Sequence, residues 1–183
     1  MWKNGWVMTT IRPSHDDDVA AITAIYAHHV LHGTGTFETT PPTEAEMLGR
    51  RADVLAKGLP FLVAEDGGRV LGYAYCQWFK PRPAYRFSAE DSIYLHPDAI
   101  GKGLGKQLLT ALEHQSVAAG VRKLIAVIGD SSNTASVGVH RSGGFVQVGV
   151  IKSCGWKFAK WLDIVLMEKS LGEGDSTPPD LNQ

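Results

Sequence analysis

Apolar side chains recur every three or four residues in several stretches of the chain, which is the spacing of a helix that buries one face. The clearest stretches are residues 19–30, which follow three aspartates, and residues 104–119. A further helix is expected from Thr43, where Glu46 completes a capping box, and a short one over residues 133–142. The pattern therefore predicts about four helices.

Short apolar runs between these helices predict strands. Residues 61–65 and 70–79 flank an Asp-Gly-Gly turn and are expected to form an antiparallel hairpin. The remaining runs cover residues 10–12, 92–95, 123–128, 145–151 and 161–168. The two strands around the 104–119 helix form a βαβ unit and are expected to run parallel. The fold class is therefore α/β, or mixed α+β, with a central mixed, mostly antiparallel sheet flanked by the helices.

No linker or internal repeat divides the chain, so one domain is expected over residues 10–171. Residues 1–9 are expected to form an N-terminal extension. Residues 172–183, with the sequence GEGDSTPPDLNQ, are polar and rich in Pro and Gly, which predicts a disordered tail.

The formal net charge of −1, from 18 basic and 19 acidic residues, gives no basic surplus. We therefore expect neither a nucleic acid nor a membrane surface as a partner. No stretch reaches the ~18 consecutive apolar residues of a membrane span, and the N-terminus has no signal-peptide pattern. A cytoplasmic location is expected.

The two cysteines, Cys76 and Cys154, are too far apart to form a C-x-x-C metal or redox pair. Two reduced thiols are expected, and a disulfide between them stays open. His28 and His32 stand one helical turn apart, but a solvated helix end explains them better than zinc does. No metal site is expected.

The strongest chemical signal is the stretch IGKGLGK at residues 100–106, between a predicted strand and a predicted helix. Glycine lets the backbone adopt a positive φ and approach a ligand closely. The amides of a helix's first turn have no partner within the helix and suit an anion. The stretch therefore predicts a pyrophosphate cradle, with a plain strand-to-helix turn as the structural alternative. The residues expected at the phosphates are Gly101, Lys102, Gly103, Leu104, Gly105 and Lys106.

The glycine spacing excludes two common phosphate-binding loops. It does not match G-x-x-x-x-G-K-[ST], the loop of nucleoside triphosphatases. It is one position shorter than the G-x-G-x-x-G fingerprint of dinucleotide-binding enzymes. Asp130, after the next strand, stands where the ribose-binding acid of that fold would be, which keeps a nicotinamide oxidoreductase open.

Residues 92–109, SIYLHPDAIGKGLGKQLL, resemble the acetyl-CoA motif [RQ]-x-x-G-x-[GA] of the GNAT superfamily of N-acetyltransferases. Ile100 stands where that motif usually has Gln or Arg. A second match joins Asn133, Ala135, His140 and the Gly144-Phe145 pair, although many members have Tyr in place of His140. The resemblance implies the GNAT fold, in which two central strands splay apart.

The likeness narrows to the phosphinothricin and methionine-sulfoximine acetyltransferases. It rests on residues 36–38 (TFE), 85–95 and 155–163, and it extends from about residue 10 to residue 171. It implies transfer of acetyl from acetyl-CoA to the α-amine of a small amino-acid analogue by direct attack. It also implies a homodimer.

The same resemblance implies roles for individual residues. The acetyl-pantetheine arm would lie between residues 92–95 and 123–128, and a backbone N–H assigned to Leu95 would stabilise the tetrahedral oxyanion. Glu90 is the candidate base, with a solvated carboxylate as the alternative, and His140 is a candidate acid for the CoA thiolate, with a structural role as the alternative. The residues expected along the arm are Ile93, Tyr94, Leu95, Asn133 and Ser136.

The acceptor substrate is expected to meet a second group of residues. Arg86 and Lys80 are candidates for its carboxylate or acidic side group, whereas an ordinary surface arginine is the default for Arg82. The full group is Phe37, Glu38, Lys80, Arg82, Arg86, Glu90, Asp91 and Ser92.

Two other functions stay open on the sequence. A protein or peptide N-acetyltransferase would need an open acidic groove, and the basic, Pro-rich residues 80–86 argue against one. A non-catalytic CoA-binding module would bind the coenzyme without turnover.

Overall fold

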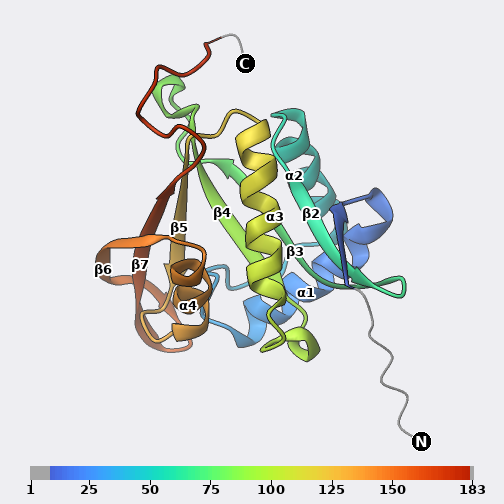
Figure 1. Cartoon of the computed structure of the whole chain (residues 1–183). Coiled ribbons are helices and arrows are strands. Elements are labelled where there is room, and N and C mark those ends of the chain that lie inside the picture. The colour runs from blue at the N-terminus through green and yellow to red at the C-terminus, as the bar shows by residue number, and fades with distance from the viewer. Residues whose placement is uncertain (1–8, 182–183) are drawn as a thin grey trace, which may run out of the picture.

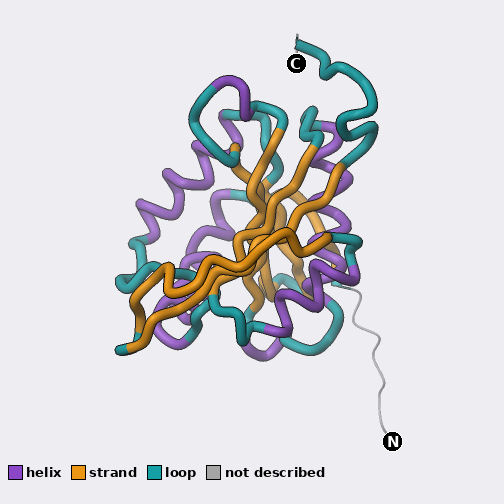
Figure 2. Tube along the Cα trace, turned by 90° about the vertical axis from the view of Figure 1, so that its left-hand side faces the viewer, coloured by secondary structure: helices purple, strands orange, loops and turns teal. Residues whose placement is uncertain are grey.

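The computed structural model describes residues 9–181, in which seven strands form one sheet with helices on both faces (Figures 1 and 2). The strand order is β1-β2-β3-β4-β5-β7-β6. The strands are β1 (Thr10–Pro13), β2 (Phe61–Asp66), β3 (Arg69–Trp78), β4 (Ser88–Leu95), β5 (Lys123–Gly129), β6 (Val146–Lys157) and β7 (Lys160–Ser170). The helices are α1 (Val19–His32), α2 (Glu44–Ala56), α3 (Leu104–Ala118) and α4 (Thr134–Ser142), with short 3₁₀ turns η1 (Asp16–Asp18), η2 (Pro83–Tyr85) and η3 (Pro97–Ala99).

The predicted order of helices and strands is confirmed, and so is the mixed sheet, because β4 and β5 are parallel and the other neighbours antiparallel. Two strands, β4 and β6, are much longer than expected. β4 begins at Ser88 because its polar residues still pair with strands on both sides. β6 continues to Lys157 and forms a long hairpin with β7 at one edge of the sheet (Figure 1).

Local sequence signals explain where several elements begin and turn. Thr43 caps α2 by accepting a hydrogen bond from the Glu46 amide at 3.2 Å, and the Glu46 side chain accepts from the Thr43 amide at 2.7 Å. Gly67 and Gly68 both have positive φ, 56° and 85°, as a tight two-residue hairpin between β2 and β3 requires.

Alternation along the strands divides the core between the two faces of the sheet. Phe61 and Val63 pack with the apolar residues of α1 and α2, whereas Leu62 and Ala64 pack against Leu108 and its neighbours on α3. Helices α1 and α2 therefore cover one face of the central strands, and α3 covers the other.

An opening in the sheet lies between β4 and β5. The two strands pair from Ser88↔Lys123 to Asp91↔Ala126, and no pairing joins them beyond that point within the described residues. β4 nevertheless stays paired to β3 as far as Leu95, and β5 to β7 as far as Gly129. The expected splay at the middle strands is confirmed.

Residues 172–181, part of the expected disordered tail, form turns that lie against Arg122. Its guanidinium donates to the carbonyl of Gly174 at 3.3 Å, the hydroxyl of Thr177 at 3.2 Å and the carbonyl of Pro178 at 3.4 Å. The expected N-terminal extension lies outside the described residues except for Thr9. No helix in residues 9–181 is long and apolar enough to cross a bilayer.

Leu108→Ala should destabilise the protein by about 2–5 kcal/mol, because Leu108 is fully buried between α3 and the sheet and its loss leaves a cavity. The measurement is the free energy of unfolding from denaturant titration. Leu48→Ala makes the same change on α2 at a side chain that is 41% exposed, and it should cost less than about 0.5 kcal/mol. Equal losses in the two variants would contradict the packing described for α3.

Candidate active site

The opening between β4 and β5 leads into a cleft of ≈ 620 Å³. Its walls come from both strands, the glycine loop, the start of α4 and the end of α1. Lys102 does not line it, but the other residues expected along the coenzyme do: Ile93, Tyr94, Leu95, Gly101, Gly103, Leu104, Gly105, Lys106, Asn133 and Ser136. One elongated ligand can therefore contact the glycine loop and the splayed strands together.

The glycine loop presents open space at the N-terminus of α3. Gly101 and Gly103 have φ of 79° and 77°, and a Cβ built on either would meet no atom of residues 9–181 within 4 Å. Gly103 is the N-cap of α3, and no side chain in the described part of the chain caps this helix. The first-turn amides from Leu104 onward therefore keep their capacity to bind an anion, which fits a pyrophosphate.

The backbone of β4 turns its free groups toward the cleft at every second residue. The His96 amide donates to the Leu71 carbonyl at 2.8 Å, which makes this pair a hydrogen-bonded one in the antiparallel ladder. Because the pattern alternates, Ile93 and Leu95 direct their N–H and C=O groups away from β3 and toward β5. These are the positions that an extended pantetheine arm would need.

His29 on α1 contacts the backbone of the same strand, a role that was not predicted from the sequence. Its Nε2 lies 2.8 Å from the Leu95 carbonyl oxygen, and its ring packs against Tyr94 at 5.4 Å between centroids. Burial lowers the pKa of His29, with the Leu95 hydrogen bond acting in the opposite direction. A neutral ring that donates from Nε2 therefore fixes the Leu95 carbonyl at the cleft.

Asp91 and His140 form a buried pair where β4 and β5 separate. His140 Nε2 lies 2.8 Å from Asp91 Oδ2, and its Nδ1 lies 2.8 Å from the Ser136 carbonyl oxygen. Burial lowers the pKa of His140, but the hydrogen bond and charge of Asp91 outweigh it and raise that pKa. Both ring nitrogens are engaged by protein groups, which favours the structural alternative for His140.

Asn133 caps α4, since its Oδ1 accepts a hydrogen bond from the Ser136 amide at 3.2 Å. Its Nδ2 lies near Gly35 in the cleft wall. The side-chain amide of Asn133 therefore has two roles: its oxygen caps α4, and its nitrogen faces the cleft.

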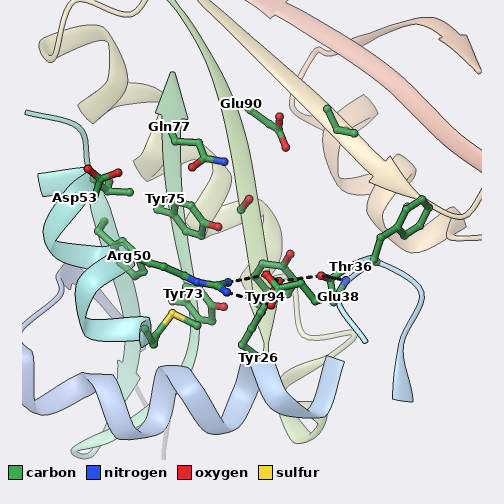
Figure 3. Close-up of a pocket in the computed structure, with 18 of the residues that line it drawn as sticks. Tyr26, Thr36, Glu38, Arg50, Asp53, Tyr73, Tyr75, Gln77, Glu90 and Tyr94 are labelled. Atoms are coloured by element: carbon green, nitrogen blue, oxygen red, sulfur yellow. Dashed lines mark hydrogen bonds and ion pairs between the residues drawn. The ribbon is translucent and has the colours of Figure 1, made fainter. Parts of the chain in front are cut away.

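A second cavity of ≈ 490 Å³ lies on the α1 and α2 face of the sheet (Figure 3). Glu90, Phe37 and Glu38, which are among the residues predicted to contact the acceptor substrate, line this cavity. Aromatic rings make up much of its wall, contributed by Tyr26, Phe37, Phe61, Tyr73, Tyr75 and Tyr94. We call it the acceptor cavity.

Arg50 on α2 also lines the acceptor cavity and was missed from the sequence. Its guanidinium points toward Glu38 and donates to both carboxylate oxygens, at 2.6 and 3.2 Å (Figure 3). Tyr26 donates to the same carboxylate at 2.9 Å. In the sequence, Arg50 stands on the polar side of an amphipathic helix, as surface arginines commonly do. The sequence therefore did not indicate that Arg50 lines a cavity.

Glu90 stands apart from that ion pair on β4. Burial raises the pKa of its carboxyl, the neighbouring charge of Asp91 raises it further, and Lys80 acts against both. A carboxylate with a raised pKa in a cavity is suited to accept a proton from a substrate.

The two cavities meet at the splay. Both are lined by Ser92 and Tyr94 of β4, by Val127 and Gly129 of β5, and by Gly35. A group held in the acceptor cavity therefore faces a group held in the cleft across the gap between the two strands.

The basic loop before β4 does not join this arrangement. Lys80, Arg82 and Arg86 are exposed and line neither cavity. Lys80 lies over the Phe79 ring and Arg86 over the Phe87 ring, at 4.8 and 4.9 Å. The prolines predicted a loop here, but they did not indicate whether its side chains face a cavity or solvent.

No cluster of three or more His, Cys, Asp or Glu side chains within residues 9–181 is placed to hold a metal ion. Cys76 is buried and Cys154 exposed, and both are free thiols.

The sequence matches the model of the acetyltransferase (GNAT) family over residues 22–145. The chain belongs to this family. A phosphinothricin N-acetyltransferase of Alcaligenes faecalis is 55% identical over 171 residues, which cover 93% of this chain and 87% of the relative. An L-methionine sulfoximine/L-methionine sulfone acetyltransferase of Pseudomonas aeruginosa is 40% identical over 174 residues, or 92% of this chain and 98% of the relative.

Solved structures of the family share the fold. The GNAT superfamily phosphinothricin acetyltransferase from Sinorhizobium meliloti, in complex with AcCoA, has a TM-score of 0.92 at 45% identity, covering 94% of each chain. The chain is thus an acetyl-CoA-dependent GNAT acetyltransferase, and the nicotinamide alternative is set aside. The residues at the glycine loop and on β4 fit acetyl-CoA as co-substrate.

Gly103→Val should weaken acetyl-CoA binding by about tenfold or more, a cost of about 1.4 kcal/mol. The reason is that a β-branched side chain at φ of 77° is strained and its Cβ enters the space before the α3 amides. Calorimetric titration measures the dissociation constant. Gly49→Val, in α2 and also without a neighbour within 4 Å, should leave it unchanged. Equal affinity in both variants would contradict the cradle.

Proposed function

We propose that this chain transfers the acetyl group of acetyl-CoA to the α-amine of a small amino-acid analogue of the phosphinothricin, methionine sulfoximine or methionine sulfone type. The observation that carries the proposal is the meeting of two cavities at Ser92, Tyr94 and Gly129. The names of the relatives from Alcaligenes faecalis and Pseudomonas aeruginosa support the acceptor class.

The chemistry proposed is direct attack of the amine on the thioester. Glu90 accepts a proton from the amine, directly or through water, as the C–N bond forms and the thioester carbonyl becomes an oxyanion. The Leu95 amide, which faces the cleft, donates to that oxyanion, and one such donor is typically worth ~3 kcal/mol. The carbonyl re-forms as the C–S bond breaks, and CoA leaves as a thiolate that takes up a proton from water.

Protonation of that thiolate by His140 would require its Nε2 to leave Asp91. We therefore propose that His140 and Asp91 hold α4 against β4. His140 could act as the acid only if its Nε2 exchanged Asp91 for the thiolate.

Charge in the acceptor cavity suits an ammonium group. Its wall carries the carboxylates of Glu38, Asp53 and Glu90 against the guanidinium of Arg50, the one basic side chain lining it in the described residues. We propose that Arg50 helps to orient the anionic group of the substrate. Binding by Lys80, Arg82 or Arg86 would require the exposed loop to close over the cavity.

We further propose a cytoplasmic homodimer. The tip of the β6–β7 hairpin exposes Trp156, Phe158 and Trp161 by 58, 49 and 62%, and two of these rings contact each other at 5.3 Å. Exposed aromatic side chains gathered on one element are typical of protein interfaces.

Purified protein should release CoA thiol from acetyl-CoA when phosphinothricin, methionine sulfoximine or methionine sulfone is added. A peptide array with free N-termini and lysines should give no such release, because the acceptor cavity is small and walled by aromatic rings. A thiol-reactive dye provides the measurement. Turnover with peptides alone would favour the protein acetyltransferase, and coenzyme binding without any turnover the non-catalytic module.

Activity should rise with pH through the pKa of Glu90, which burial raises above the ordinary glutamate value, because the base acts when deprotonated. Glu90→Gln should remove that rise and lower kcat/KM by about 100-fold. Initial rates across a pH series measure both effects. Glu44→Gln, the same change at an exposed residue of α2, should keep the wild-type profile. An unaltered profile in Glu90→Gln would assign the proton to another group.

A further inference from the structure

Residues 33–38, which we call the junction loop, separate the coenzyme cleft from the acceptor cavity. Gly33 and Thr34 line the cleft, Thr36 and Glu38 line the acceptor cavity, and Gly35 lines both. Figure 3 shows Thr36 and Glu38 beside Tyr94 at the wall of the acceptor cavity. A ligand in either cavity would therefore contact this loop.

Lys157, the last residue of β6, reaches this loop from the other end of the chain. Its ammonium donates to the carbonyl oxygens of Gly33 and Thr36, both at 2.8 Å. The residue is only 4% exposed, and no carboxylate lies at ion-pair distance from it within residues 9–181. The buried ammonium is thus satisfied by loop carbonyls.

Such a placement is unfavourable for the cation itself. Burial lowers the pKa of Lys157, and the charge of Glu38 opposes that shift only from a distance. A buried cation without a paired carboxylate has a desolvation cost that an apolar side chain would avoid. Burial of the ammonium therefore has a free-energy cost, and what the cation gains in return is its two hydrogen bonds to carbonyls of the junction loop.

Glycines on β6 and on β5 also hold the loop by packing. A Cβ on Gly155 would lie 2.4 Å from the ring of Phe37, and a Cβ on Gly129 would lie 2.4 Å from the Thr34 carbonyl oxygen. Phe37 is therefore seated against glycine backbone on β6, while Thr34 is seated against glycine on β5. Two glycines within the loop would otherwise leave its backbone free to move.

We propose that Lys157 is a positioning residue for acetyl transfer, which fixes the junction loop so that the acceptor amine and the thioester meet in reactive geometry. It touches neither cavity and acts through the carbonyls of Gly33 and Thr36. The kinetic part of this inference rests on the proposed function.

Lys157→Met tests the proposal, because it keeps an unbranched side chain and removes the ammonium. Lys152→Met is the matched control, the same change on β6 at an exposed lysine. With phosphinothricin or methionine sulfone, kcat/KM for the acceptor should fall by about 100-fold in Lys157→Met. Small misplacements of reactants cause rate losses of this size. The KM for acetyl-CoA should match that of the control. Equal kcat/KM values in the two variants would overturn the proposal.

Amide hydrogen exchange measures the loop without any substrate. Residues 33–38 should exchange faster in Lys157→Met than in Lys152→Met, while α3 keeps its protection. Unchanged exchange would overturn the inference even if turnover fell. Faster exchange in a protein that acetylates no amine would uphold the role in the loop and reject the proposed function instead.

Lys157→Gln keeps the test decisive if Lys157→Met is isolated only as unfolded protein. The glutamine is still polar, but its nitrogen is one bond closer to the backbone and cannot span both carbonyls. It should show the same loss of acceptor kcat/KM and the same faster exchange. Wild-type values for both would overturn the proposal.

Discussion

The hydrogen-bond ladder between β4 and β5 stops after Asp91↔Ala126, and the site depends on that early end. Beyond it, the N–H and C=O groups of Ile93 and Leu95 face a gap instead of a neighbouring strand. Backbone groups in a protein interior need partners, so an open ladder is a place where an extended ligand gains hydrogen bonds. His29 satisfies one of these groups, the Leu95 carbonyl, and leaves the others available.

Packing on both faces keeps the strands apart. On the α3 and α4 face, the Asp91–His140 pair ties α4 to β4 at the point of separation, although Asp91 Oδ1 is buried without a hydrogen-bond partner in residues 9–181. On the other face, the Tyr94 ring packs against Tyr26 and Tyr73 at 5.0 and 5.4 Å. Side-chain contacts on both faces therefore hold β4 in place where the ladder ends.

The sequence predicted those features whose cause lies within a few residues. The Thr43–Glu46 cap, the Gly67-Gly68 hairpin and the glycine loop before α3 each depend on neighbours along the chain. The contacts that sequence reasoning missed join distant positions. Arg50 meets Glu38 across 12 residues, His29 meets Leu95 across 66 and Lys157 meets Gly33 across 124.

These distant contacts depend on tertiary packing, which local sequence patterns do not indicate. In the sequence, Arg50, His29 and Lys157 therefore each resembled an ordinary polar residue. At residues 80–86 charge suggested substrate contact; the loop is exposed and lines neither cavity, so substrate contact there stays a prediction. Residue type indicates which chemistry is available, whereas tertiary packing decides which residues face the cavity.

Alternation along β4 divides the chemistry between the two reactants. Glu90 lines only the acceptor cavity, Asp91 and Ile93 line only the cleft, and Ser92 and Tyr94 lie where the two meet. A slip of one residue against β3 would exchange these faces and place the Asp91 carboxylate among the acceptor's aromatic rings. The continuous register from Gly72↔Leu95 to Trp78↔Ala89 prevents that slip, so the β3–β4 ladder fixes which side of the strand can bind a coenzyme and which an amine.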